Sequence, residues 1–241
     1  MIHCAALANP SLDCNIFGMG RARRVCAGGI VYHVLNRANR RARIFHKPGD
    51  YQAFLRILQE GLEGIPCRVL GLCLMPNHWH LVLWPHGDGD LSRLMAWVSN
   101  THVKRYREHY HDKVGGHLYQ GRFKSFPVQQ DYHLLTLLRY VEANPLRAHL
   151  AERAGEWPWS TDALLTNEYA PLFSPWPLPR PADWAQLVEA RWKETEISEI
   201  QTSLDRGRPL GDTMWTQQTA MDLGLELSLR PKGRPAKAKV L

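Results

Sequence analysis

Apolar positions in the first part of the chain switch between strand-like runs and helical spacing. Residues 29–36, GIVYHVLN, are β-branched and aromatic and begin at a Gly-Gly pair, which predicts a first strand. Residues 50–61 place apolar side chains three and four positions apart behind Asp50, which predicts a helix capped by that aspartate. Two further apolar runs, 67–74 and 79–84, flank a Met-Pro-Asn break and predict two strands joined by a tight turn.

A second series of elements follows. Residues 91–110 carry one apolar face, 118–128 look extended, and Asp131 precedes a leucine-rich helix that runs to about Asn144. The order β-α-β-β-α-β-α, with an antiparallel central pair, predicts a ferredoxin-like α+β sandwich. We expect a central antiparallel sheet with its helices on one face.

The last third of the chain has a different character. From Trp157 it is rich in proline and tryptophan, which indicates an ordered wrap; a polar helix at about 183–206 and a short helix within 207–225 follow. The chain is therefore divided into a poorly ordered tail or over-extended reading frame before Met19 (1–18), an α+β domain (19–160), a Pro/Trp-rich wrap with a helical extension (161–229) and a basic tail (230–241).

Charge narrows the class of partner. The 241 residues hold 30 Lys and Arg against 23 Asp and Glu, a formal charge of +7, and seven arginines without an acid lie between Arg21 and Arg43. Such clusters favour nucleic acid. Five cysteines without a C-x-x-C pair argue against a disulfide framework or a thiolate zinc site, and no apolar run reaches transmembrane length. We expect a cytoplasmic, nucleoid-associated protein.

Two histidines in the strand at 79–84 and its entry carry the first candidate chemistry. Because side chains alternate along a strand, His78 and His80 face one side while Trp79 faces the other. Two imidazoles held this way can bind a metal and leave coordination positions open. The alternative is a pair of polar residues on an exposed sheet face. His109 and His111 repeat the spacing at a helix end, where they point apart, and are interpreted as surface residues.

A tyrosine and an amide form the second candidate pair. Tyr140 and Asn144 are four residues apart on the predicted helix and therefore share a face beside its leucine stripe. Without further information Tyr140 is equally a core aromatic. Asn144 precedes Pro145, an order that also suits the N-cap of a new helix.

Five motifs in order give a resemblance to a known family. They are GGIVYHVLNR (28–37), MPNHWHLV (75–82), YQGRF (119–123), RYVEANPLRA (139–148) and WPWS (157–160). The chain resembles the single-tyrosine HUH transposases, and among them the insertion-sequence type and the relatives associated with repetitive extragenic palindromes (REP elements).

The resemblance implies a mechanism. Tyr140 matches a nucleophile that attacks single-stranded DNA to form a 5′-phosphotyrosine link and a free 3′-hydroxyl. His78 and His80 match ligands of Mg²⁺ or Mn²⁺, and Asn144 matches a third ligand, with the helix cap as its alternative. The free phenol has a pKa of about 10, so its attack at neutral pH needs a nearby cation.

Basic residues are the expected DNA contacts, and the substrate implied by the resemblance is a hairpin with a single-stranded flank. The tail sequence RPKGRPAK resembles an AT-hook, in which Arg234 would enter an A·T minor groove; a solvated basic tail is the alternative. His33 and Arg37 either touch phosphate or lie on a solvated sheet edge. The candidate DNA-binding residues are Arg37, Arg40, Arg41, Arg43, Lys104, Arg105, Arg122, Lys124 and Arg234.

Two rival functions remain open. A domesticated DNA-binding protein would keep the fold and the basic surface without cleaving DNA. A metal-dependent hydrolase that activates water would tolerate Tyr140→Phe and leave no protein-DNA adduct. The oligomeric state is undetermined by the sequence, and a monomer is the working expectation.

Overall fold

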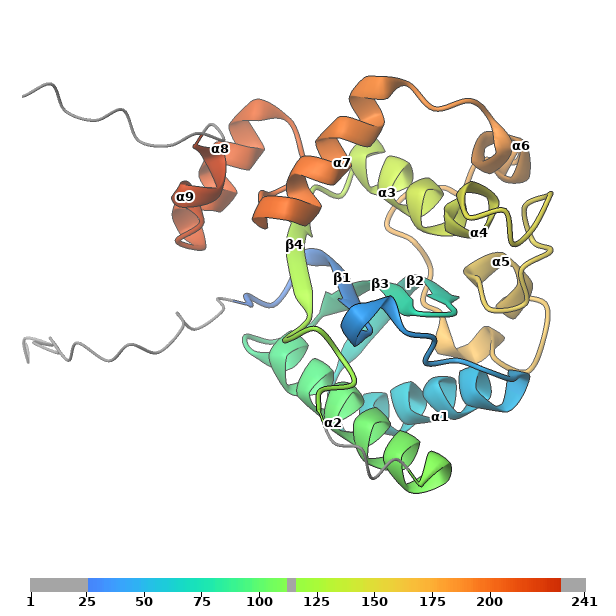
Figure 1. The fold of residues 1–241 in the computed structure, drawn as a ribbon. Coiled ribbons are helices and arrows are strands. Elements are labelled where there is room, and N and C mark those ends of the chain that lie inside the picture. Colours follow the sequence, from blue (N-terminus) through green and yellow to red (C-terminus); the bar gives the residue numbers. More distant parts are fainter. Residues whose placement is uncertain (1–25, 112–115, 231–241) are drawn as a thin grey trace, which may run out of the picture.

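The computed structural model describes residues 26–111 and 116–230, and within them an antiparallel sheet of four strands forms the centre (Figure 1). Its order is β2-β3-β1-β4, so β1 lies inside the sheet with β3 on one side and β4 on the other. The strands are β1 (Val31–Arg37), β2 (Cys67–Met75), β3 (His78–Pro85) and β4 (Lys124–Val128).

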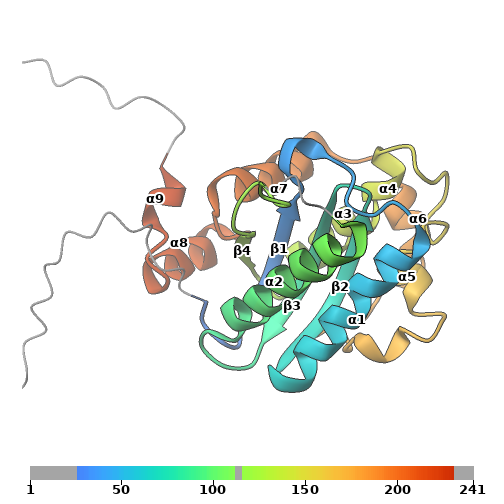
Figure 2. The same cartoon turned by 60° about the horizontal axis from the view of Figure 1, so that its bottom comes forward.

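Helices cover both faces of the sheet. Two long helices, α1 (Pro48–Gly64) and α2 (Asp90–Tyr110), lie on one face, and α3 (Tyr132–Glu142) lies on the other (Figures 1 and 2). The predicted α+β sandwich with a central antiparallel sheet is confirmed, whereas the expectation of helices on one face is wrong. The reason is visible in β2, where seven consecutive residues, Val69 to Met75, are buried, so both faces need cover.

The helix starts follow local capping chemistry. Asp131 caps α3, since its carboxylate accepts the backbone N–H of His133 at 2.8 Å, as predicted. Asp50 is not the cap of α1 but its third residue, and it accepts the backbone N–H of Lys47 at 3.0 Å and of His46 at 2.7 Å. The Asp50 carboxylate therefore stabilises the start of α1 from a position within its first turn.

A glycine sets the distance between α3 and the sheet. A Cβ built on Gly71 of β2 would lie 2.7 Å from Cδ2 of Leu138, closer than real carbon atoms approach. Without a side chain at this position, α3 packs directly onto β2 and β3. The close approach fixes the height of α3 above the sheet.

The Pro/Trp-rich segment runs along the outer edge of β2. The indole N–H of Trp157 donates to the carbonyl of Leu74 at 2.8 Å, and that of Trp176 donates to the carbonyl of Leu70 at 2.7 Å. These bonds satisfy carbonyls that an edge strand would otherwise leave open. The wrap thereby shields the edge from pairing with another chain.

The C-terminal helices extend the core on the α3 face. Trp184, Val188, Ile200 and Leu204 join the same apolar cluster as Leu134 and Leu137 of α3. Of the described residues, none forms a helix both long and apolar enough to span a bilayer. The remaining helices are η1 (Asn39–Arg41), α4 (Asn144–Arg147), α5 (Thr161–Leu164), η2 (Ala170–Leu172), α6 (Trp184–Glu189), α7 (Glu194–Arg206), α8 (Thr213–Asp222) and α9 (Glu226–Leu229).

The helix expected at 183–206 is two helices, α6 and α7. Arg139 of α3 explains the break, because its guanidinium donates to the carbonyl of Leu187 at 2.5 Å and to that of Ala190 at 2.7 Å. It also lies 3.9 Å from the ring centre of Trp192. Arg139, which is distant in the sequence, thus ends α6 by donating hydrogen bonds to carbonyls of its last turn. The predicted tail at 1–18, and all of the predicted tail at 230–241 except Arg230, lie outside the described residues.

Candidate active site

The structure brings the two histidines and the tyrosine to one cavity. His78 and His80 of β3 and Tyr140 of α3 line a cavity of about 400 Å³ on the α3 face of the sheet. The ring centres of His78 and His80 are 5.1 Å apart, and those of His80 and Tyr140 are 6.1 Å apart. Strand pairing adds Arg37, which lies opposite His78 in the register.

A buried histidine lies behind His80. Nε2 of His33 is 2.9 Å from Nδ1 of His80, and His33 is fully buried against Phe126. Both predictions for His33, a phosphate contact or a solvated edge, are wrong because pairing with β4 makes β1 an inner strand. The other ring nitrogen of His33, Nδ1, is buried without a partner among the described residues.

The second histidine is held by its neighbour in the chain. Nδ1 of His78 lies 2.6 Å from Oδ1 of Asn77, whose Nδ2 donates to the carbonyl of Arg41 at 3.2 Å. Because an amide oxygen can only accept, Nδ1 of His78 carries the proton and Nε2 keeps a lone pair. Asn77 therefore links the candidate ligand to the arginine loop.

Burial keeps both imidazoles neutral. Desolvation, with Arg37 and Arg147 nearby, lowers the pKa of His78 to about 4. Desolvation, reinforced by His33 and His78, holds the pKa of His80 well below its ordinary value. Neutral rings are the form that binds metal, so both residues are competent ligands at neutral pH.

The side chains of Arg147 and Trp192 both pack against the ring of Tyr140. The guanidinium carbon of Arg147 is 3.9 Å from the centre of its ring, and the ring of Trp192 packs edge-on at 6.1 Å between centres. Sequence reasoning assigned no role to either residue. RYVEANPLRA contains Arg147, but only the fold shows that α4 turns it back over the tyrosine.

Asn144 makes hydrogen bonds through both ends of its amide. Nδ2 donates to the carbonyls of Tyr140 at 3.1 Å and Val141 at 3.2 Å, and Oδ1 accepts from Arg147 at 2.8 Å. The side chain thus caps the end of α3, whereas the predicted cap at the start of the next helix is wrong: Asn144 is the first residue of α4, and its N-cap is Ala143. Its amide also lines the cavity.

Part of the chain that contains this site is similar to a known protein family. Residues 26–144 match the family model described as "Transposase IS200 like". Residues 26–144 thus resemble this family, and they make up just under half of the 241 residues. The family consists of DNA-processing enzymes, so the predicted relationship is confirmed. The segment contains all three candidate catalytic and metal positions on β3 and α3, and it ends at Asn144.

Individual relatives are distant in sequence. The chain is 23% identical over 128 residues to the Haemophilus influenzae protein named "Putative REP-associated tyrosine transposase", covering 46% of this chain and 69% of that protein. A solved structure titled as a REP-associated tyrosine transposase bound to a REP hairpin is 21% identical, with a TM-score of 0.49, covering 68% of this chain and 93% of that one. A transposase structure from Deinococcus radiodurans is 15% identical, with a TM-score of 0.34, covering 52% and 94%.

HUH transposases generally use a divalent metal, and the site offers part of its coordination shell. Among the described residues, no group of three or more His, Cys, Asp or Glu side chains could hold a metal ion. His78 and His80 supply two neutral imidazoles at a polar cavity, and Nε2 of His78 has a free lone pair. This donor set fits a metal that completes its shell with water and phosphate oxygens.

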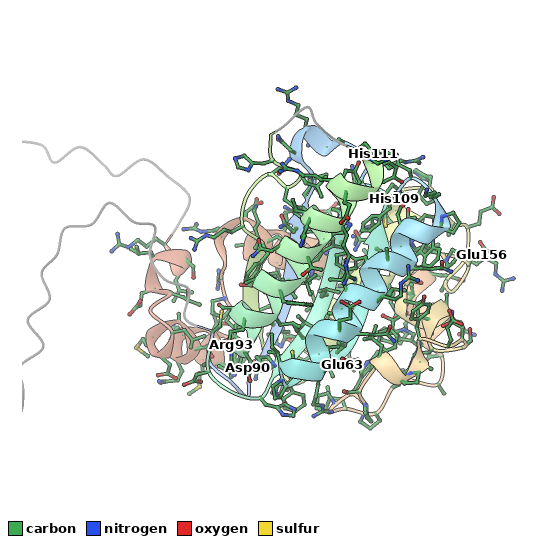
Figure 3. All side chains as sticks on the ribbon, turned by 90° about the horizontal axis from the view of Figure 1, so that it is seen from below. Glu63, Asp90, Arg93, His109, His111 and Glu156 are labelled. Atoms are coloured by element: carbon green, nitrogen blue, oxygen red, sulfur yellow. The ribbon has the colours of Figure 1, made fainter. Side chains whose placement is uncertain are left out.

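The predicted DNA contacts of this transposase separate into groups. Arg37, Arg122 and Lys124 line the cavity. Lys104 and Arg105 do not reach it, because α2 covers the opposite face and Arg105 pairs with Glu60 of α1 at 2.7 Å. Arg234 lies outside the described residues. His109 and His111 are exposed at the end of α2, as predicted (Figure 3).

The arginine loop after β1 is held beside the histidine turn. Its residues Arg40 and Arg41 have positive φ values of 53° and 57°, which is unfavourable for arginine. The flanking backbone fixes them: the N–H of Ala38 donates to the carbonyl of Asn77 at 2.9 Å, and that of Ile44 donates to Pro76 at 2.8 Å. Arg40, Arg41 and Arg43 are exposed, and none of them lines the cavity.

Three residues of α7 also line the cavity and were missed from sequence. They are Gln201, Leu204 and Asp205. The apolar spacing of the helix predicts that one of its faces is buried. The sequence of the helix itself does not indicate which part of the protein covers that face.

Proposed function

We propose that this transposase is a metal-dependent single-strand DNA endonuclease and strand transferase that acts through Tyr140. The observation that carries the proposal is the convergence of Tyr140, His78 and His80 on one cavity, with Arg147 against the phenol. Pure DNA binding needs none of these contacts. The predicted 19–160 domain carries the chemistry.

The reaction is a transfer of one phosphodiester bond. The Tyr140 oxygen attacks phosphorus as the bond to O3′ breaks, which leaves a 5′-phosphotyrosine and a free 3′-hydroxyl, while the phenol proton passes to water and O3′ takes one up. Attack by a 3′-hydroxyl on the phosphotyrosine reverses the step and rejoins strands. Arg147 stabilises the negative charge that develops on the phenol oxygen.

His78 and His80, through their Nε2 atoms, would hold Mg²⁺ or Mn²⁺, with the Asn144 amide oxygen as the proposed third ligand. The ion supplies a Lewis acid that polarises the non-bridging phosphate oxygen and orients the phosphate. Oδ1 of Asn144 already accepts from the Arg147 cation, so its second lone pair would face the metal.

The proposed substrate is a DNA hairpin of repetitive palindromic elements with a single-stranded flank. The printed name of the Haemophilus relative supports this substrate class, and the charge of +7 suits it. We propose that the protein acts as a monomer on nucleoid DNA in the cytoplasm and that the tail at 230–241 adds A·T minor-groove contacts.

One observation favours the rival, a domesticated DNA-binding protein. Three residues of α7 line the cavity and Trp192 packs edge-on against Tyr140, so the C-terminal extension could restrict access to the tyrosine. A permanently closed site would bind DNA without cleaving it.

The two functions are separated by incubating the protein with labelled single-stranded oligonucleotides from the flanks of its own gene. The proposal predicts a metal-dependent covalent adduct that Tyr140→Phe abolishes. Tyr132→Phe is the control, because Tyr132 begins the same helix and is 66% exposed. Cleavage that survives Tyr140→Phe indicates an activated-water hydrolase, and binding without cleavage indicates the domesticated protein.

A further inference from the structure

A second cavity adjoins the Tyr140 cavity on the other side of one stretch of chain. It has a volume of about 1010 Å³ and lies between α2 and residues 117–123, and we call it the α2 groove. Asn36, Gly121 and Arg122 line both cavities. A bound polymer strand that leaves the Tyr140 cavity past Arg122 therefore enters the α2 groove.

The lining of the groove combines apolar surface with positive charge. Ala96, Val103 and Leu118 contribute apolar surface that is at least partly exposed, while Arg93, Arg107 and Arg122 contribute charge. None of the described residues that line it is acidic. Arg93 begins α2 beside Asp90, its ion-pair partner, and its side chain is 67% exposed (Figure 3). This combination suits a polyanion that also offers flat apolar faces.

One buried hydroxyl beside the groove lacks a hydrogen-bond partner in the part of the chain that the structure describes. Oγ of Ser99 is buried and has no hydrogen-bond partner among the described residues, although serines in helices commonly bond to a carbonyl one turn earlier. Ser99 lines the groove. A ligand that enters deeply gains a hydroxyl that can donate or accept.

We propose that the α2 groove binds the single-stranded DNA that continues from the phosphodiester held at Tyr140. This inference rests on the proposed function. Unstacked bases bury their faces on apolar and aromatic side chains, and their phosphates pair with arginines. Duplex DNA keeps its bases stacked inside and offers no such face.

The test compares hairpin oligonucleotides with no flank, a 5′ flank or a 3′ flank by fluorescence anisotropy. The blocking variant is Ala96→Trp, because Ala96 is exposed on α2 and lines the groove. The control is Gln217→Trp, because Gln217 is uncharged, is exposed on α8 and lines neither cavity. For wild type, a flank on one side should raise affinity about tenfold or more, as base stacking alone contributes roughly 1–3 kcal/mol per base.

Ala96→Trp should lose this flank-dependent gain and keep the affinity for the flankless hairpin, while Gln217→Trp keeps both. A gain that survives in Ala96→Trp, or a wild type that binds hairpins but gains nothing from either flank, would overturn the groove assignment alone. A wild type that binds none of the oligonucleotides would overturn the proposed function and the groove with it. Photocrosslinking from iodouracil in the flank to the peptide containing Phe123 gives an independent positive result.

Discussion

At the scale of single residues, His33 decides what His80 can do. Only one ring nitrogen of His80 faces the cavity as a ligand, and it has a lone pair only when Nδ1 donates its proton to His33. Such partners behind a metal-binding histidine fix its tautomer and its orientation. His33 is therefore a positioning residue in the proposed site.

His33→Gln should weaken Mn²⁺ binding about tenfold or more, because loss of a partner of this kind typically reduces affinity 10–100-fold. Electron paramagnetic resonance of free Mn²⁺ measures the affinity directly. His102→Gln is the control, since His102 is equally buried but bonds to Tyr119, outside the site. An unchanged Mn²⁺ affinity in a folded His33→Gln protein would remove His33 from the account.

The sequence could place His78 and His80 together because strand alternation is a local rule. The i, i+4 spacing of a helix likewise placed Tyr140 and Asn144 near each other, although Asn144 begins α4 and is not part of α3. Neither rule could reveal the role of His33, which depends on whether β1 is an edge strand. That in turn depends on pairing with β4, about ninety residues later in the chain.

At the scale of elements, α3 and α6 meet through a buried carboxyl. Oε2 of Glu142 accepts the indole N–H of Trp184 at 2.9 Å, and Oε1 is buried without a partner among the described residues. Burial raises the pKa of Glu142 to about 7 from its ordinary 4.5. The contact between the two helices is therefore sensitive to pH.

Between pH 4.5 and 7 the folded protein keeps a proton on Glu142 that the unfolded chain has released. The contribution of the Glu142 proton to the free energy of unfolding is therefore complete below pH 4.5 and is lost as the pH rises from 4.5 to 7. Glu142→Gln should therefore become more stable relative to wild type from pH 5 to pH 8, by roughly 1–3 kcal/mol. Urea denaturation at both pH values measures this, with the exposed Glu63→Gln as control (Figure 3). A pH-independent difference would mean that Glu142 titrates normally.

Most element positions followed from periodicity and capping residues, as with Asp131 at the start of α3. The break between α6 and α7 did not, because Arg139 causes it from a distant part of the chain. The placement of α1 and α2 on one face and α3 on the other depends on which faces of the assembled sheet are apolar. The sequence of a single helix does not contain this information.

At the scale of the whole molecule, the C-terminal extension completes the core around the site. Its apolar residues pack on α3 and its helix α7 lines the cavity, whereas sequence composition predicts only an ordered wrap or linker followed by helices. The predicted boundary after residue 160 remains a prediction. The shared apolar cluster favours one cooperative unfolding transition for both parts.

Ile200→Ala in α7 should lower the free energy of unfolding by about 2–5 kcal/mol, because Ile200 is fully buried in the cluster with α3. Ile197→Ala in the same helix is the control, since Ile197 is 37% exposed and should cost much less. Denaturation followed by tryptophan fluorescence should give a single transition for each. Two separate transitions, with only one shifted by Ile200→Ala, would show that the extension folds by itself.

The central claim is that Tyr140 forms the covalent link to DNA, and the most direct measurement is mass spectrometry of the linked peptide. Wild-type protein is incubated with Mn²⁺ and a flank oligonucleotide, digested with protease and nuclease, and fragmented. The account predicts a 5′-phosphonucleotide on the peptide that contains Tyr140, located on the tyrosine itself. Cleaved DNA with no modified peptide, or a nucleotide on another residue, would contradict it.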